Sequence, residues 1–260
     1  MLELGLEGKV AIVTGGSDGM GLATASRLVS EGVRVAICAR RAENLERAAD
    51  ELRAAGGGGD VFAQPADVTS AGDVDRFIDA VTAEFGGVDI LINNAGASAA
   101  QGLEALGDDA WMADIELKVM GAVRFCRGVV PSMRERGGGA IVNATIGGGK
   151  AAPARALPTS VTRAAGINLT KSLANELAAD NIRVNTICIG LIKSEQWVRR
   201  AEGQGVDVES VYDAMGKRVP LGRVGEAEEY ADLIAFLVSE RGAYITGTAI
   251  NLDGGLCPVV

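Results

Sequence analysis

The chain has 260 residues, of which 48% are hydrophobic, and a formal net charge of −9. No run of Lys or Arg could neutralise a phosphate backbone, which argues against a nucleic-acid partner. There is no histidine, which excludes Ser-His-Asp catalysis and histidine-ligated metal sites; we expect no metal centre.

Apolar, strand-like runs alternate with helical patterns along the whole chain. Strands are expected at 9–14, 33–38, 61–66, 88–92, 140–145, 182–188 and 248–252. Helices are expected at 19–31, 42–55, 71–85, 108–134, 159–179 and 226–239. This alternation predicts an α/β chain with a Rossmann-type doubly wound fold, in which helices cover both faces of a seven-stranded parallel sheet.

No shift in composition marks a second domain, so residues 1–260 are expected to form a single nucleotide-binding domain. The stretch 193–218 has the least regular pattern and follows a strand, where an open α/β sheet covers its ligands. Residues 1–9 lack the basic-then-apolar order of a signal peptide, and no apolar run approaches the roughly 20 residues that span a bilayer. We therefore expect a cytoplasmic protein with no membrane partner.

Residues 14–21 (TGGSDGMG) form a glycine-rich loop between the first strand and the first helix. Glycines allow a tight turn and close approach to a pyrophosphate, and the helix N-terminus offers unpaired N–H groups and a partial positive charge. The loop predicts a dinucleotide site; a purely structural turn is the alternative. The residues expected to contact the ligand are Gly15, Ser17, Asp18, Gly19, Met20 and Gly21.

Other stretches extend this pattern across the chain: Asp67-Val68, NNAG at 93–96, PLGR at 220–223 and LDGG at 252–255. Together with the TGxxxGxG spacing of the loop, they resemble the short-chain dehydrogenase/reductase family. The resemblance implies a bound nicotinamide dinucleotide and a homotetramer or homodimer that packs through the helices around 111–134 and 159–179. It also implies cofactor contacts from Asp67, Val68, Asn94, Ala95, Gly96, Arg163, Ile192 and Ser194.

The end of the second strand indicates which dinucleotide binds. The strand ends Cys38-Ala39-Arg40, without the carboxylate that would bind the adenosine ribose hydroxyls of NAD. The guanidinium of Arg40 suits a 2′-phosphate instead. We expect a preference for NADP(H), with NAD(H) as the alternative; a solvated surface charge is the other interpretation of Arg40.

The resemblance also locates the family's four catalytic positions. A Tyr there exchanges the proton, a Lys four residues later lowers the Tyr pKa, a Ser polarises the substrate carbonyl, and an Asn holds a water. Counting back from 170–178 (TKSLANELA) places the Tyr and Lys positions at Thr159 and Arg163. Residues 141–143 and Trp111 place the Ser and Asn positions at Ile146 and Lys118. All four positions are therefore substituted.

Four residues are candidates for the chemistry. Lys118, close to Arg163 and partly buried, would have a lowered pKa and could act as an acid/base or a Schiff-base amine. Thr159 is a poor proton donor unaided, Thr145 could hydrogen-bond a carbonyl, and Arg163 could hold the ribose but stays protonated. The alternative is that Lys118 is a structural residue in a degenerate site.

Basic residues suggest an anionic substrate. Lys150, Lys193 and Arg199–Arg200 could lie near the mouth of the site, where a basic cleft would attract a carboxylate or an acyl-CoA. Surface charge is the alternative, and it is the favoured interpretation of Arg199–Arg200. Three functions follow. The first is an NADP(H)-dependent oxidoreductase with a non-standard active site, acting on a small carbonyl, enoyl or imine. The second is a lyase or isomerase that uses Lys118, and the third is a non-catalytic nucleotide-binding protein.

Overall fold

A computed structural model describes residues 3–56 and 58–260. The strands form one parallel sheet in the order β3-β2-β1-β4-β5-β6-β7, which confirms the predicted seven-stranded doubly wound fold. The strands are β1 (Val10–Thr14), β2 (Arg34–Cys38), β3 (Val61–Ala63), β4 (Ile90–Asn93), β5 (Gly139–Ile146), β6 (Ile182–Ile189) and β7 (Ala249–Leu252).

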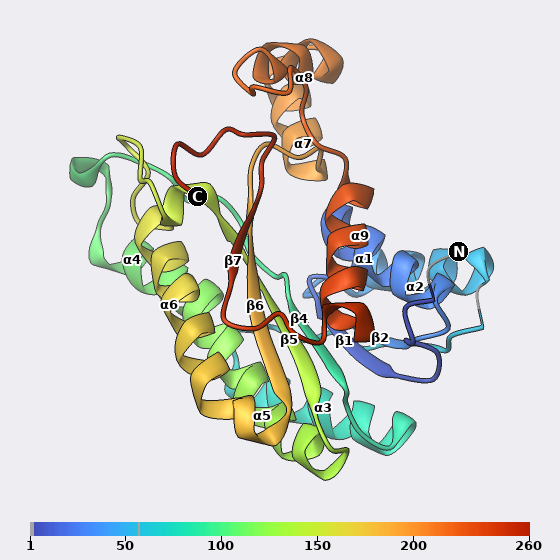
Figure 1. The fold of residues 1–260 in the computed structure, drawn as a ribbon. Coiled ribbons are helices and arrows are strands. Elements are labelled where there is room, and N and C mark those ends of the chain that lie inside the picture. Colours follow the sequence, from blue (N-terminus) through green and yellow to red (C-terminus); the bar gives the residue numbers. More distant parts are fainter. Residues whose placement is uncertain (1–2, 57) are drawn as a thin grey trace.

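Helices cover both faces of the sheet (Figure 1). One face carries α1 (Gly19–Ser30), α2 (Ala42–Ala55) and α9 (Ala227–Val238), whose apolar residues share a core with the strands. The other face carries α3 (Ala71–Phe85), α4 (Asp108–Ile115), α5 (Gly121–Glu135) and α6 (Thr159–Leu177). Short helical turns lie at Leu103–Ala105, Gly147–Gly149, Ala178–Asp180 and Glu240–Gly242. Because both faces are covered, the strands consist of nearly continuous apolar runs.

Two predicted elements differ from the structure. The helix expected over 108–134 is interrupted by a π-helical turn, Glu116–Met120, between α4 and α5. The stretch 193–218 is not irregular, because it contains α7 (Glu195–Gln204) and α8 (Val208–Gly216). These two helices are short and pack on a small apolar cluster that includes Tyr212, Met215 and Val224, so their sequence pattern is weak.

The strand order places the functional residues. β1 and β4 are neighbours, although β2 and β3 intervene in the sequence. The chain therefore changes direction across the sheet between them, and in open α/β folds ligands bind at the carboxyl ends of such strands. None of the helices in the described ranges has the length and apolarity needed to cross a bilayer.

Candidate active site

The glycine loop connects the carboxyl end of β1 to α1. Gly15 and Gly19 have φ values of +65° and +51°, which side-chain-bearing residues rarely adopt. A Cβ atom on Gly21 would lie 2.1 Å from the carbonyl oxygen of Gly15, so only glycine fits there. The first turn of α1 receives no side-chain cap, which leaves its N–H groups available to an anion.

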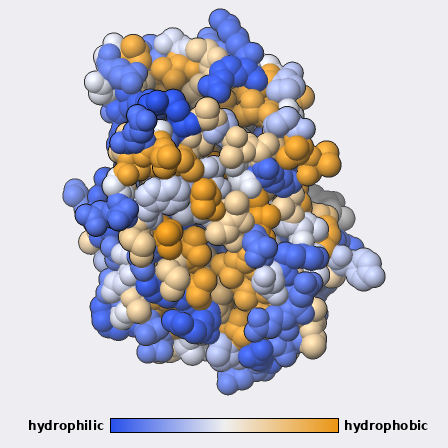
Figure 2. All heavy atoms as spheres, turned by 90° about the vertical axis from the view of Figure 1, so that its left-hand side faces the viewer, coloured by the Kyte–Doolittle hydropathy of each residue, from blue (hydrophilic) through white to orange (hydrophobic). Residues whose placement is uncertain are grey.

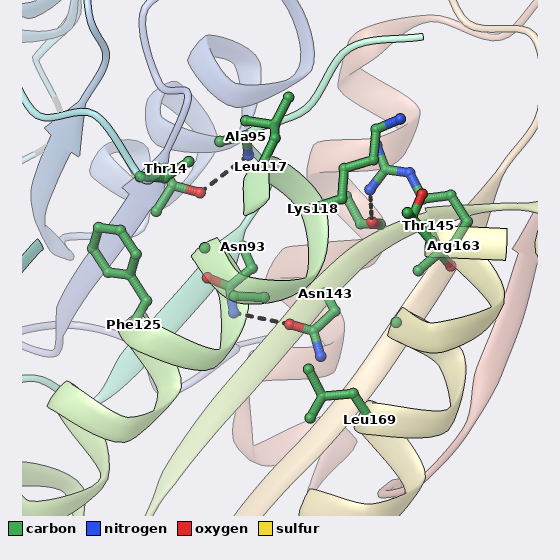
Figure 3. A pocket seen from close by; sticks show the side chains of 16 residues that line it. Thr14, Asn93, Ala95, Leu117, Lys118, Phe125, Asn143, Thr145, Arg163 and Leu169 are labelled. Atoms are coloured by element: carbon green, nitrogen blue, oxygen red, sulfur yellow. Dashed lines mark hydrogen bonds between the residues drawn. The ribbon is translucent and has the colours of Figure 1, made fainter. Parts of the chain in front are cut away.

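The loop is tied to the end of β4. The side-chain amide of Asn94 donates to the carbonyl oxygens of Thr14 and Gly15 at 3.0 and 3.2 Å. The hydroxyl of Thr14 accepts from the backbone N–H groups of Asn94 and Ala95, each at 3.0 Å (Figure 3). These bonds place the exposed Gly96 beside the loop, at the same edge of the sheet.

Other predicted cofactor residues lie around this edge. Arg40 is exposed and forms no ion pair or hydrogen bond with the residues that the structure describes. Val68 is buried, whereas Asp67 is half-buried and accepts hydrogen bonds from the backbone and side chain of Thr69. Ser194 faces the glycine loop, because a Cβ on Gly19 would lie 3.9 Å from the Ser194 Cβ.

Lys118 lies in the π-helical turn with its side chain fully buried. Its ammonium donates to Asp114 Oδ1 at 2.5 Å and to Thr159 Oγ1 at 3.0 Å. Burial lowers the pKa of Lys118, the charge of Arg163 lowers it further, and the hydrogen bond to Asp114 opposes both effects. A lysine whose pKa is lowered towards neutrality can exchange protons during a reaction.

The residues around Lys118 form a continuous polar network between α4 and α6. Thr159 Oγ1 also accepts from the backbone N–H of Ala99 at 3.1 Å. The hydroxyl of Thr162 donates to Asp114 Oδ2 at 2.7 Å. The structure thus brings together Thr159 and Lys118, two of the predicted catalytic positions, although 41 positions separate them.

Arg163 completes the cluster from the next turn of α6. Its Nη1 donates to the carbonyl oxygen of Ala144 at 2.5 Å, and its buried Nε has no hydrogen-bond partner among the described residues. Burial lowers the pKa of this guanidinium, which nevertheless stays protonated at neutral pH. A Cβ on Gly96 would lie 2.5 Å from Arg163 Nη2, so the arginine reaches the edge that carries the glycine loop.

Figure 3 shows the pocket that Lys118, Thr162 and Arg163 of this cluster line. Lys118 and Arg163 lie near its upper end, and Asn93 donates to Asn143 at 2.9 Å deeper in the protein. Thr145 also lines the pocket, but its hydroxyl is bonded to Thr186 Oγ1 at 2.9 Å within the sheet. This hydroxyl is therefore engaged, contrary to the expectation that Thr145 would hydrogen-bond a substrate carbonyl.

The expected basic cleft is not formed. Lys193 pairs with Glu226 at 2.8 Å, and the ammonium of Lys150 donates to the carbonyl oxygen of Ala249 at 2.7 Å. Lys118 is neutralised by Asp114, and Arg199–Arg200 lie exposed on α7. The partners of Lys150 and Lys193 lie far away in the sequence, so the charge count of the sequence did not predict these two contacts.

Two residues of the network, Asp114 and Thr162, escaped the sequence-based prediction. Asp114 lies four residues before Lys118, the spacing at which an acidic and a basic residue share one helix face. That spacing is a signal from which the sequence could have predicted Asp114. The sequence holds no such signal for Thr162, because its bond to Asp114 depends on how α4 packs against α6.

Comparisons with known proteins agree with this architecture. A family model described as enoyl-(acyl carrier protein) reductase matches residues 15–257. Dehydrogenase/reductase SDR family member 4 of Oryctolagus cuniculus is 36% identical over 257 residues, which are 96% of this chain and 94% of that protein.

Two solved structures are similar over nearly their whole length. L-sorbose reductase from Gluconobacter frateurii, complexed with NADPH and L-sorbose, gives a TM-score of 0.95 at 36% identity and covers 100% of both chains. An NADPH-bound short-chain oxidoreductase from Pseudomonas aeruginosa PAO1, described as containing an atypical catalytic center, gives 0.91 at 37% identity. The match covers 97% of this chain and 98% of that one.

Proposed function

This chain belongs to the short-chain dehydrogenase/reductase family, and from that premise we propose that it is an NADP(H)-dependent oxidoreductase whose proton donor is Lys118. The observation that carries the proposal is the contact between Lys118 and Thr159, 3.0 Å apart beside the pocket. In the family pattern these are the Asn and Tyr positions. A proton-exchanging group is therefore present near the usual place, although the usual phenol is not.

The residues at the strand edge fit an NADP(H) molecule. The uncapped N-terminus of α1 and the glycine loop would hold the pyrophosphate. The unpaired guanidinium of Arg40 would hold the 2′-phosphate, and Arg163 and Ser194 would lie near the nicotinamide half. The NADPH found in both similar solved structures supports the same preference. NAD(H) remains the less favoured alternative.

We propose that the four substituted positions work as a different set. Ile146, at the Ser position, carries no hydrogen-bonding side chain, so Thr159 and Lys118 together replace the groups that polarise the substrate. Arg163 replaces the Lys and keeps a positive charge beside the ribose. The relative from Pseudomonas aeruginosa, with its atypical catalytic center and bound NADPH, supports a departure of this kind.

The proposed reaction is the reduction of a small carbonyl compound; enoyl and imine compounds are the next candidates. When bound, NADPH supplies the hydride to the carbonyl carbon. Lys118 and Thr159 hydrogen-bond the carbonyl oxygen as negative charge develops on it. The Lys118 ammonium gives this oxygen a proton, which completes the alcohol, and the resulting amine regains a proton from solvent.

The lyase or isomerase alternative receives less support. A Schiff base requires a neutral, nucleophilic amine, whereas the Lys118 ammonium is paired with Asp114 at 2.5 Å. A site that binds the nucleotide without turnover also receives less support. A buried polar network surrounds the proposed donor, and this network favours a catalytic role.

The proposal also covers organisation. Residues 1–260 would act as one cofactor-binding domain, and the segment of about 193–218 would cover the substrate. The protein would be located in the cytoplasm. The face formed by α4, α5 and α6 would pack against a second copy. Figure 2 shows apolar side chains gathered on this face, and Met112 and Val161 are exposed on α4 and α6. A homodimer or homotetramer would sediment above the 26.6 kDa of one chain.

One experiment tests the function directly. NADPH oxidation is followed with a panel of ketones, aldehydes, enoyl compounds and imines, for the wild type and for Lys118→Met. We expect turnover in the wild type and at least a 100-fold loss of kcat in Lys118→Met, with NADPH affinity unchanged. Lys171→Met, which removes an exposed lysine from α6, is the matched control. Full activity in Lys118→Met would contradict the proposal.

A further inference from the structure

We propose that Asp114 is a positioning residue that keeps Lys118 protonated and aims one of its N–H groups at the substrate. This inference rests on the proposed function, in which Lys118 is the proton donor. It adds a residue that the family pattern does not use, and it explains how a buried lysine can hold a proton until the reaction needs it.

The carboxylate of Asp114 is fixed at both oxygens. Its side chain is 3% exposed. Oδ1 accepts from Lys118 on the following π-helical turn at 2.5 Å, and Oδ2 accepts from the Thr162 hydroxyl of α6 at 2.7 Å. A carboxylate held at both oxygens by donors on two different elements cannot rotate away. Asp114 therefore sets the position of the ammonium relative to α6.

The hydrogen atoms of the ammonium can be counted. A lysine ammonium has three N–H donors. One donates to Asp114 and one to Thr159, and among the described residues nothing accepts from the third. Lys118 is one of the residues that line the pocket, and we assign this third N–H to a substrate oxygen.

The same count applies to Thr159. A hydroxyl has two acceptor positions and one donor. Lys118 and the backbone N–H of Ala99 occupy the two acceptor positions, so the hydroxyl hydrogen must point elsewhere. The result is two neighbouring donors, one from Lys118 and one from Thr159, and Asp114 holds the first of them in place.

Asp114 is also the residue whose charge favours the protonated form of Lys118. The charged groups that act on Lys118 are Asp114 on α4 and Arg163 on α6. From α5, Arg124 is paired with Glu116 of the π-helical turn at 2.6 Å. Burial and Arg163 favour the neutral amine, and only Asp114 favours the ammonium. Without that carboxylate, Lys118 would lose its proton at a lower pH and would have none to give.

Stability alone does not account for this pair. Two buried charges cost solvation free energy that their attraction rarely exceeds, and well-packed apolar residues usually replace such a pair without loss. A buried ion pair is therefore weak evidence for a contribution to stability. A role in proton transfer accounts for the position of this pair beside the pocket, with Lys118 bonded to Thr159.

The test measures the titration of Lys118 itself. The protein is labelled with ¹³C at lysine Cε, and the Lys118 signal is assigned as the one missing from Lys118→Met. In Asp114→Asn we expect this signal to titrate at a pH lower by at least about 1 unit, because an opposite charge in contact has been removed. The other five lysines should not change. Asp109→Asn, an exposed position on the same helix, is the control and should leave Lys118 unchanged.

An activity profile gives the second readout. As an acid, Lys118 works only when protonated, so the rate falls as the pH rises through its pKa. In Asp114→Asn the alkaline limb of kcat/KM should move to lower pH by the same amount as the NMR titration. Asp114→Glu, which keeps the charge, should restore the limb toward that of the wild type.

The outcomes separate the two proposals. An unchanged Lys118 titration in Asp114→Asn would overturn the role of Asp114, whatever the activity. A shifted titration without NADPH-dependent turnover would support that role and contradict the proposed function. If Asp114→Asn does not fold, the wild type decides: the Asp114 ¹³Cγ signal must shift at the pH where Lys118 loses its proton, and a signal that does not respond overturns the inference.

Discussion

The carboxylate of Asp18, in the glycine loop, lies 3.5 Å from the guanidinium of Arg41, the residue that follows Arg40. Arg47 approaches the other oxygen of Asp18 at 3.5 Å. Two of the three arginines at this edge are therefore paired with a loop carboxylate. Arg40 is the one left for a phosphate, so it carries the proposed cofactor preference.

Arg40→Asp should reverse that preference. The substitution removes the partner of the 2′-phosphate and adds a carboxylate that can accept hydrogen bonds from ribose hydroxyls. We expect the ratio of NADPH to NADH affinity to fall by at least 10-fold in calorimetric titrations, because a charge-assisted contact is replaced by repulsion. Arg53→Asp makes the same change near the C-terminal end of α2 and should leave the ratio of NADPH to NADH affinity unchanged. An unaltered ratio in Arg40→Asp would assign the preference elsewhere.

Gly21→Ala should abolish dinucleotide binding. The new Cβ would lie 2.1 Å from the carbonyl oxygen of Gly15, so the loop must open to admit it. We expect NADPH affinity to fall by more than about 100-fold, since the loop could no longer follow the pyrophosphate. Gly203→Ala is the matched control, because this helical glycine of α7 has nothing within 4 Å of the added atom. Fluorescence titration with NADPH measures both, and equal affinities would contradict the assigned loop role.

Thr159→Val tests the second proposed donor. Valine keeps the shape of threonine but removes the hydroxyl that accepts from Lys118 and Ala99. We expect kcat to fall by roughly 100-fold, as when an oxyanion-stabilising donor is lost, while NADPH affinity stays constant. Thr159→Ser keeps the hydroxyl and should retain most activity. Equal loss in both variants would point to packing rather than hydrogen bonding.

Glu229→Gln tests the anchoring of α9. Arg223 and the backbone N–H of Glu226 hold the pKa of Glu229 at about 2, below the ordinary 4.5. A depressed pKa stabilises the fold above pH 4.5, and that contribution is lost as the pH falls from 4.5 through 2. Glutamine can still cap the helix, so Glu229→Gln should lower the free energy of unfolding by only about 1 kcal/mol at pH 7.

Denaturant unfolding at several pH values checks this expectation. The difference between wild type and Glu229→Gln should shrink as the pH approaches 2. Glu228→Gln, an exposed neighbour, should show almost no difference at any pH. A difference for Glu229→Gln that did not change with pH would mean that the ion pair is not its source.

The sequence predicted the sheet and the glycine loop because both depend on local patterns. Apolar runs such as VAIVT and the glycines at 15, 19 and 21 specify a strand and a turn without help from distant residues. Lys118 and Thr159 were brought together only through the family resemblance. The bond between Asp114 and Thr162 could not be predicted, since these residues are 48 positions apart and meet only because α4 packs against α6.

The interruption of the long helix was beyond the same reasoning. Residues 108–134 have a continuous helical pattern, and no Gly or Pro lies within 116–120 to mark an interruption there. The π-helical turn is seen only in the structure, where Lys118 points towards α6 while the apolar stripe of α5 still faces the sheet. The π-helical turn holds one residue more than an α-helical turn, and it satisfies both the contact of Lys118 with α6 and the packing of α5 on the sheet. Local periodicity in the sequence does not predict such a turn.

That extra residue fixes how α5 is rotated about the helix axis relative to α4. In an α-helix 3.6 residues make one turn, so one added residue rotates everything after it by about 100° relative to what precedes it. Phe125, Val129 and Met133 are buried on α5 only in this phase. Deleting one residue from 116–120 would turn that stripe out of the core. The hydrophobic contacts of α5 thus hold Lys118 in register with Thr159. The geometry of the site is maintained by core residues that lie about 10 to 22 Å away along the helix.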